Sequence, residues 1–208
     1  KRSITEFRNI NGVFPHNIIV YRDGVSESQR KTLKETEVGA FLRAFDELKN
    51  LGMPEKPRFI FVCVNKRMTA KFFNGDNLQR DGNLTNPEQG TVIDSEVTSG
   101  NDFYLISQKT TQGSAAPTHY FVLSYCVNKD NQYVEEPPEN MPEQVLRQLQ
   151  ALTYKLCYMY YNWSGSIKVP APIQYAAKLS NLIGDRWNPN NPMIPHNQYE
   201  KYKSLYFI

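Results

Sequence analysis

The stretch Ile18–Val25, with the sequence IIVYRDGV, runs four apolar residues almost directly into a carboxylate, Asp23. A short apolar run of this kind predicts a central strand that is covered on both faces of a sheet. Gly24 allows the chain to turn abruptly after the strand. Asp23 is therefore expected at the carboxyl edge of a sheet, where ligands bind in open α/β folds, although an acid after a strand is often only a turn or cap residue.

The residues that follow predict a β-α-β unit. Ser26 and Gln29 have the spacing of a capping box, and apolar residues then recur at helical spacing, so we expect a helix from about Ser26 to Lys49. Pro57–Val64 has the composition of a second buried strand. A helical crossover between two strands favours their parallel pairing.

The rest of the chain is expected to extend this sheet and to add helices. Apolar spacing predicts one helix from about Pro142 to Asn162 and another over about Ile173–Ile183. Lys129–Glu143 is acidic and rich in proline, which indicates a solvated loop. Short strands are expected at Thr91–Ile93, Asp102–Ser107 and His119–Cys126.

Composition limits the class of protein. A chain of 208 residues that is 40% hydrophobic can bury one sizeable core. Its formal net charge of +3 permits nucleic-acid binding without requiring it. No apolar run approaches the roughly 20 residues that cross a bilayer, and the first residues lack a signal-peptide core, so we expect an intracellular protein of cytoplasm or nucleus with no membrane partner. The three cysteines are an odd number in apolar contexts, which favours reduced core thiols.

Several longer blocks occur in one order along the chain and carry a family resemblance. Together they resemble the C-terminal half of a PIWI domain, and PTHY, LTYKLC and YYNW resemble the Piwi branch of the Argonaute family. The resemblance implies an α/β fold, an RNase H-like mixed sheet flanked by helices. Residues 1–208 would form the C-terminal part of a single PIWI domain, with the upstream PIWI half and the domain that binds the guide 5′ end outside this chain. The blocks are YRDGVSESQ, VNKRMTAKFF, GTVIDSEVT, DFYLISQ, APTHYFVL, LTYKLCYMYYNW, KVPAPIQYAAKL and the terminal LYFI.

The resemblance also implies a metal-dependent cleavage site. In this family an acidic tetrad holds two divalent cations, Mg²⁺ or Mn²⁺, which cleave an RNA target paired to a small guide RNA. Two ions about 4 Å apart can hold the attacking water and the leaving oxygen of a phosphoryl displacement. Asp23 matches the third member of the tetrad, a catalytic metal ligand. The first aspartate and the mobile glutamate are expected upstream, since Glu6 is the one acid before Asp23.

The fourth tetrad position of the family corresponds to Ala177, within PAPIQYAAKL. A methyl group cannot ligate a metal ion, so the cleavage site is expected to be substituted. Lys178 would have to act from about 100° further around the helix, which is poor geometry for a replacement. His119, in PTHY, is interpreted as a hydrogen-bonded histidine at a packed strand end, structural or close to the guide, rather than as the missing ligand.

Guide binding is implied for polar residues in the same blocks. Their amide, hydroxyl and ammonium donors can bind a phosphate backbone without reading its sequence. The terminal carboxylate of Ile208 is expected to enter the guide 5′-phosphate pocket, where a cation would bridge it to phosphates, while the competing interpretation is an apolar tail held in the core. The other expected guide-binding residues are Lys66, Arg67, Lys71, Gln108, Gln112, Tyr160, Asn162, Lys168 and Gln174.

The function that follows is small-RNA-guided RNA binding and silencing by a Piwi/Argonaute-type protein. Its expected partners are a 5′-phosphorylated small guide RNA, a complementary target RNA and proteins of a silencing complex. An active guide-directed RNA endonuclease in the full-length protein is the alternative, and Ala177 argues against it. A packing scaffold that binds no RNA is a third possibility.

Overall fold

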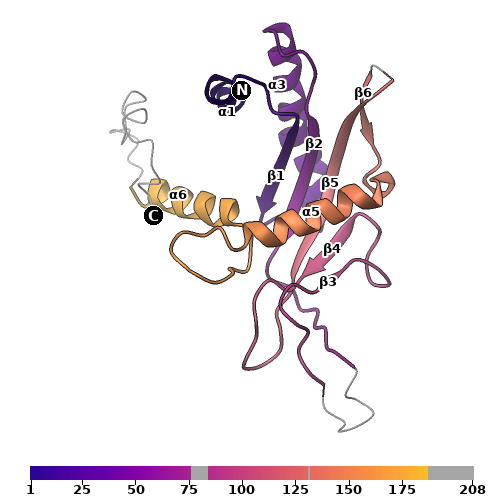
Figure 1. Cartoon of the computed structure of the whole chain (residues 1–208), viewed down its shortest axis with the longest axis vertical. Coiled ribbons are helices and arrows are strands. Elements are labelled where there is room, and N and C mark those ends of the chain that lie inside the picture. Colours follow the sequence, from indigo (N-terminus) through magenta and orange to yellow (C-terminus); the bar gives the residue numbers. More distant parts are fainter. Residues whose placement is uncertain (76–83, 131, 187–208) are drawn as a thin grey trace.

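One mixed sheet organises the chain, and the computed structural model describes it within residues 1–75, 84–130 and 132–186. The sheet has six strands in the order β1-β2-β5-β4-β3, with β6 paired to β5 (Figure 1). This arrangement confirms the expected α/β class. The strands are β1 (Asn17–Asp23), β2 (Arg58–Asn65), β3 (Val92–Ile93), β4 (Asp102–Leu105), β5 (Thr118–Lys129) and β6 (Gln132–Glu136).

The β-α-β unit predicted from the sequence is present. β1 and β2 are parallel, with Ile18 opposite Phe59 and Asp23 opposite Val64. The other paired strands of the sheet are antiparallel. Gly24 has a φ of 74°, a left-handed conformation that favours glycine, so the chain does turn abruptly after Asp23.

The helix between β1 and β2 is a composite of consecutive segments: η1 (Glu27–Gln29), α2 (Arg30–Leu33), η2 (Lys34–Val38) and α3 (Gly39–Asn50). The capping box of Ser26 and Gln29 is formed, and the predicted helix is confirmed, although η2 has the wider π-type turn. The remaining helical segments are α1 (Arg2–Asn11), η3 (Pro138–Asn140), α5 (Glu143–Leu156) and α6 (Ala171–Arg186).

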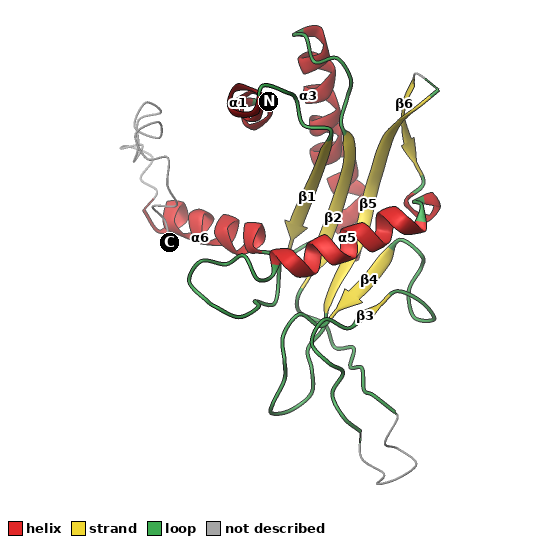
Figure 2. Ribbon diagram, in the orientation of Figure 1, coloured by secondary structure: helices red, strands yellow, loops and turns green. Residues whose placement is uncertain are grey.

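β2 lies inside the sheet and is buried on both faces, which explains its unbroken apolar run. The prediction of a central strand at Ile18–Tyr21 is wrong within the described residues, because β1 is an edge strand there and these four residues are only partly buried. Alternate side chains of β2 point to opposite sides. On what we call the α3 face, Phe59, Phe61 and Cys63 pack with Val38, Phe45 and Leu48. Figure 2 shows α5 crossing the sheet on the near side and α3 behind it.

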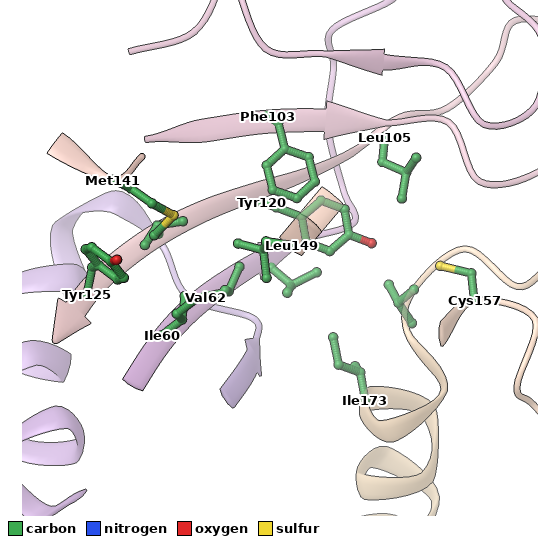
Figure 3. Packing of buried hydrophobic residues seen from close by; sticks show 13 residues of the cluster. Ile60, Val62, Phe103, Leu105, Tyr120, Tyr125, Met141, Leu149, Cys157 and Ile173 are labelled. Carbon is green, nitrogen blue, oxygen red and sulfur yellow. The ribbon is translucent and has the colours of Figure 1, made fainter. Parts of the chain in front are cut away.

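The opposite side, which we call the α5 face, holds the second core cluster. Ile60, Val62 and Val64 of β2 pack there with Leu149 of α5 and with residues of β4 and β5 (Figure 3). Cys157, just beyond α5, joins this cluster and is fully buried. The α5 face is therefore built from segments far apart in the sequence.

The prediction of a solvated loop at Lys129–Glu143 is wrong. The segment contains β6 and η3, and β6 forms a hairpin with β5 in which Val134 lies opposite Val127. The Tyr133 hydroxyl donates to the Pro57 carbonyl at 3.0 Å. Charges and prolines suggested a loop, but pairing with β5 and the half-buried Tyr133 stabilise a strand here.

The predicted helix from Pro142 to Asn162 ends early, at Leu156. Beyond it the backbone tightens, because Cys157 and Tyr158 donate to carbonyls three residues back. Met159, which lies three residues after Leu156 and would continue the apolar spacing, is 65% exposed and so does not belong to the buried stripe. The last predicted helix starts and ends two or three residues beyond its expected limits, at Ala171 and Arg186.

The expected reduced thiols are confirmed, since Cys63, Cys126 and Cys157 are all free and buried. Burial raises the pKa of both Cys63 and Cys157 to about 11, which keeps them protonated at neutral pH. Among the described helices, none has the length and apolar character needed to cross a membrane.

Candidate nucleic-acid interface

Asp23 ends β1 and is bound by a lysine. Lys66 follows β2 directly, and because β1 and β2 are parallel, their carboxyl ends meet at one edge of the sheet. The Lys66 Nζ lies 2.7 Å from the Asp23 Oδ2, with the two side chains 39% and 26% exposed. The expected metal ligand and an expected guide-binding lysine therefore form an ion pair.

The described residues do not supply the donor set of a two-ion site. In residues 1–75, 84–130 and 132–186, no group of three or more His, Cys, Asp or Glu residues is placed to hold a metal ion. Ala177 lies on α6, which contacts β1, but it offers only a methyl group. Glu6 is exposed on α1. Binding of Mg²⁺ or Mn²⁺ stays a prediction.

Lys178, the neighbour of Ala177, is directed elsewhere. Its Nζ lies 5.5 Å from the centre of the Tyr160 ring, a cation–π distance. This contact gives the predicted guide-binding residue Tyr160 a cationic neighbour.

Lys168 is held near the end of β2 that Lys66 follows, because Thr118 of β5 donates to the Lys168 carbonyl and β5 pairs with the last residues of β2. The pKa of Lys168 is lowered, first by burial and then by the positive charges of Lys71 and Lys66. These lysines come from two distant parts of the sequence: Lys66 and Lys71 follow β2, whereas Lys168 lies between α5 and α6. We call Lys66, Lys71 and Lys168 the lysine cluster.

The segment that carries Lys168 is fastened to the sheet. Ser107 Oγ and Thr118 Oγ1 donate to the Lys168 carbonyl at 3.1 and 3.0 Å. Gln108 Nε2 donates to the Ser166 carbonyl at 3.0 Å. Gln108, expected to bind the guide, thus holds the α5–α6 segment in place, and its contact with RNA stays a prediction.

The other predicted residues differ in exposure. Arg67, Lys71, Gln112 and Asn162 are exposed, and Tyr160 and Gln174 are half-buried. Tyr160 lies beside Tyr175 of α6, with ring centres 5.5 Å apart. Ile208, whose terminal carboxylate was expected in the phosphate pocket, lies outside the described residues.

His119 is a hydrogen-bonded histidine at a packed strand end, as the sequence suggested. Its Nε2 lies 2.6 Å from Asp102 Oδ2, and both side chains are almost completely buried. The ring stacks on Tyr104 of the neighbouring strand, with ring centres 4.5 Å apart. The Ser99 amide donates to the other Asp102 oxygen at 2.6 Å. Asp102 was not singled out from the sequence, because its pairing with His119 depends on the register of β4 and β5.

Tyr175 is a second residue that the sequence did not indicate. The Tyr161 amide donates to the Tyr175 hydroxyl at 2.8 Å, and that hydroxyl donates to the Met159 carbonyl at 3.2 Å. One tyrosine of α6 therefore fixes the backbone next to Tyr160. Its place in the block PAPIQYAAKL is the one sequence signal that could have drawn attention to it.

Comparison with known proteins agrees with this architecture. The family model described as the Piwi domain matches residues 1–188. Piwi-like protein 1 of Gallus gallus is 44% identical over 184 residues, which are 88% of this chain and 19% of the relative. The crystal structure of Drosophila Piwi superposes with a TM-score of 0.74 and 32% sequence identity, covering 100% of this chain and 25% of that one.

A more distant structure shares the fold. Kluyveromyces polysporus Argonaute, solved with a guide RNA, has a TM-score of 0.74 and 24% identity, covering 100% of this chain and 24% of that chain. The present chain thus spans about a fifth to a quarter of the length of these relatives. Likeness of sequence and of the RNase H-like fold over nearly the whole chain leads to one conclusion: the chain belongs to the Piwi domain family.

Proposed function

We propose that this chain is the part of a small-RNA-guided silencing protein that holds the phosphate backbone of an RNA guide and its paired target. Membership of the Piwi domain family supports this role, as does the Argonaute relative that was solved with a guide RNA. The proposal assigns RNA binding to the lysine cluster and assigns no cleavage step to the described residues.

The lysine cluster is the observation that carries the proposal. Bringing three ammonium groups close together is unfavourable unless an anion offsets their repulsion, and the lowered pKa of Lys168 reflects that repulsion in addition to burial. Asp23 neutralises Lys66, but RNA phosphates would offer several charges at once. Lysine contacts of this kind bind backbone and leave sequence recognition to base pairing.

The test is the salt dependence of RNA binding by the full-length protein. Replacing Lys66 and Lys71 by alanine should weaken binding of unrelated guide sequences equally. It should also reduce the slope of log affinity against log salt by about 1 for each lysine–phosphate pair that is removed. Fluorescence anisotropy with labelled, 5′-phosphorylated guides at several salt concentrations measures both quantities.

Lys31 and Lys49 provide a matched control. Both are exposed on the helical segments between β1 and β2, and replacing them by alanine removes the same total charge. The proposal expects a nearly unchanged slope for this control. An unchanged slope in the Lys66 and Lys71 variant, or an equal change in both variants, would contradict it.

Cleavage is tested separately, in the full-length protein and with a perfectly paired target. With Ala177 in place, the proposal expects no robust cleavage in Mg²⁺ or Mn²⁺. The variant Ala177→His returns a metal-binding side chain to this position. Robust cleavage with Ala177 would favour a guide-directed endonuclease, while cleavage only in the histidine variant would identify Ala177 as the residue that prevents it.

A further inference from the structure

The segment between α5 and α6 presents large aromatic side chains to solvent. Tyr161 is 86% exposed and Trp163 is 58% exposed. Figure 1 shows this segment leaving the end of α5 and curving away from the sheet before α6 begins. Clustered exposed rings are unusual on a protein surface and mark sites of interaction.

The indole of Trp163 lies against Gly165, which leaves room for it because it has no side chain. A Cβ atom added at Gly165 would lie 2.7 Å from Trp163 Nε1, closer than real Cβ atoms approach. Gly165 shows no left-handed φ, so its missing side chain matters here for space rather than for backbone conformation. The Trp163 amide also donates to the Tyr160 carbonyl at 3.2 Å. The backbone at Trp163 is therefore fixed, and its exposed ring lies over Gly165.

The backbone beside Tyr161 is positioned as well. The Tyr175 hydroxyl binds the Tyr161 amide and the Met159 carbonyl, and the Ile167 amide donates to the Cys157 carbonyl at 2.8 Å. These bonds close residues 157–167 into a fixed loop. A side chain on such a loop loses less freedom when it binds a ligand, which favours affinity.

The charge of the loop identifies the kind of partner. Residues 157–170 include four aromatic residues and Lys168 but no aspartate or glutamate. Lys168 belongs to the lysine cluster, and Lys178 lies over Tyr160. Flat rings next to several lysines suit a polyanion with flat bases. Single-stranded nucleic acid is bound through this combination of stacking rings and positive charge.

We infer that Trp163 and Tyr161 stack on bases of an RNA strand whose phosphates the lysine cluster holds. The inference rests on the proposed function and adds a second kind of contact, made to the face of a base and not to its phosphate. Stacking tolerates any base, so it stabilises a bound strand without changing which sequence is recognised.

Photocrosslinking tests this placement in the full-length protein. An RNA strand carrying 5-iodouridine at one position reacts on irradiation with an aromatic ring stacked against it. Two series are needed, one with the modified base moved along the guide and one with it moved along the target. We expect a crosslinked peptide containing Trp163 or Tyr161 in one series, and that series identifies the strand.

Affinity measurements with matched variants give the second readout. Trp163→Ala should lower RNA affinity by about fivefold to 100-fold, the range found for loss of one stacked base, whereas Trp163→Phe should retain most of it. Gly165→Ala should weaken binding while leaving the ring present, because it displaces the indole. Met159→Ala is the control, since Met159 is 65% exposed in the same loop but has no ring.

The outcomes separate this inference from the proposed function. If the lysine variants weaken RNA binding but Trp163→Ala does not, and no crosslink maps to the loop, the inference is overturned and the proposed function stands. Absence of RNA binding by the unmodified protein overturns both. Unchanged RNA affinity of Trp163→Ala together with loss of a bound protein would assign the loop to a protein partner and overturn the inference.

Discussion

The two faces of the sheet are both buried, but they are built from different chemistry. The α3 face is rich in phenylalanine, with Phe45 and Phe59 in edge contact at a ring-centre distance of 5.3 Å. The α5 face includes buried hydroxyl groups, and the Tyr21 hydroxyl lies 2.8 Å from Thr153 Oγ1. The lysine cluster lies at the edge of the α5 face and not of the α3 face.

The end of β1 shows the same division within two residues. Arg22 turns toward the α3 side and pairs with Glu37 of η2 at 3.1 Å, whereas Asp23 pairs with Lys66. Alternation along a strand assigns successive side chains to opposite faces. The α3 face contributes to stability, whereas the candidate RNA contacts lie at the edge of the α5 face.

The largest expected effect is on the α3 face. Phe59→Ala should lower the free energy of unfolding by about 3–5 kcal/mol, because Phe59 is fully buried and its removal leaves a cavity. Denaturant titration measures the loss, and Phe59→Leu should lose clearly less. At temperatures where the alanine variant is folded, its salt slope for RNA should match that of the unmodified protein. A loss below about 1 kcal/mol would break the comparison of the two faces.

A smaller loss is expected inside the α5 face. Tyr21→Phe removes the contact with Thr153 and should reduce the free energy of unfolding by about 0.5–1.5 kcal/mol. Thr153 Oγ1 still donates to the Leu149 carbonyl at 2.7 Å, so no buried donor is left without a partner. Burial raises the pKa of Tyr21 to about 12, so the loss should be the same at pH 7 and pH 9. A marked difference between these two pH values would contradict the buried position.

At the edge, Asp23→Asn should change stability little and RNA affinity more. The ion pair with Lys66 is partly exposed, so its contribution to stability is about 1 kcal/mol or less. Losing the carboxylate frees Lys66 for phosphate, and RNA affinity without divalent cations should rise severalfold. Binding assays in EDTA measure the rise. Weaker RNA binding under those conditions would show that Asp23 assists RNA binding by another route.

The smallest effect concerns the pH dependence of Lys168. Its native pKa is lowered, so between that pKa and the ordinary value of 10.5 the unfolded chain holds more protons than the folded one. The contribution of Lys168 to the free energy of unfolding therefore rises as pH increases through this window. Lys71→Ala removes one repelling charge and should raise the pKa of Lys168, which ¹³C-lysine NMR titration can follow. Lys31→Ala should leave it unchanged.

Local pattern was sufficient for the elements that position Asp23. The apolar run Phe59–Val64 is buried on both faces, Ile18–Tyr21 forms the parallel strand beside it and is partly buried, and the spacing after Ser26 predicts the connecting helix. The loop expected at Lys129–Glu143 was wrong because the β5–β6 pairing depends on a partner strand that local composition does not reveal. Tertiary contact overrides local preference at such positions.

For the candidate site, too, the sequence identified some residues but not the contacts between them. Asp23, Lys66 and Ala177 were placed by resemblance of their blocks, and the structure adds how the residues meet. Two of these contacts join segments far apart in the sequence, so local sequence could not reveal them. They are the ion pair of Lys66 with Asp23 and the bond from Gln108 to the Ser166 carbonyl. The exposure of Trp163 was equally hidden, because an aromatic residue after a predicted helix looks like part of a core.

The order of strands also has a consequence for the time course of folding. β5 and β6 are neighbours in sequence and form a hairpin, whereas β2 pairs with β5 across the long segment that contains β3 and β4. Local pairings close small loops and form quickly, while distant ones must first offset a larger loss of chain entropy. The β5–β6 hairpin is thus suited to form early, and the β2–β5 junction at the centre of the sheet late. Asp23 and Lys168 would reach a common edge only when that last junction has closed.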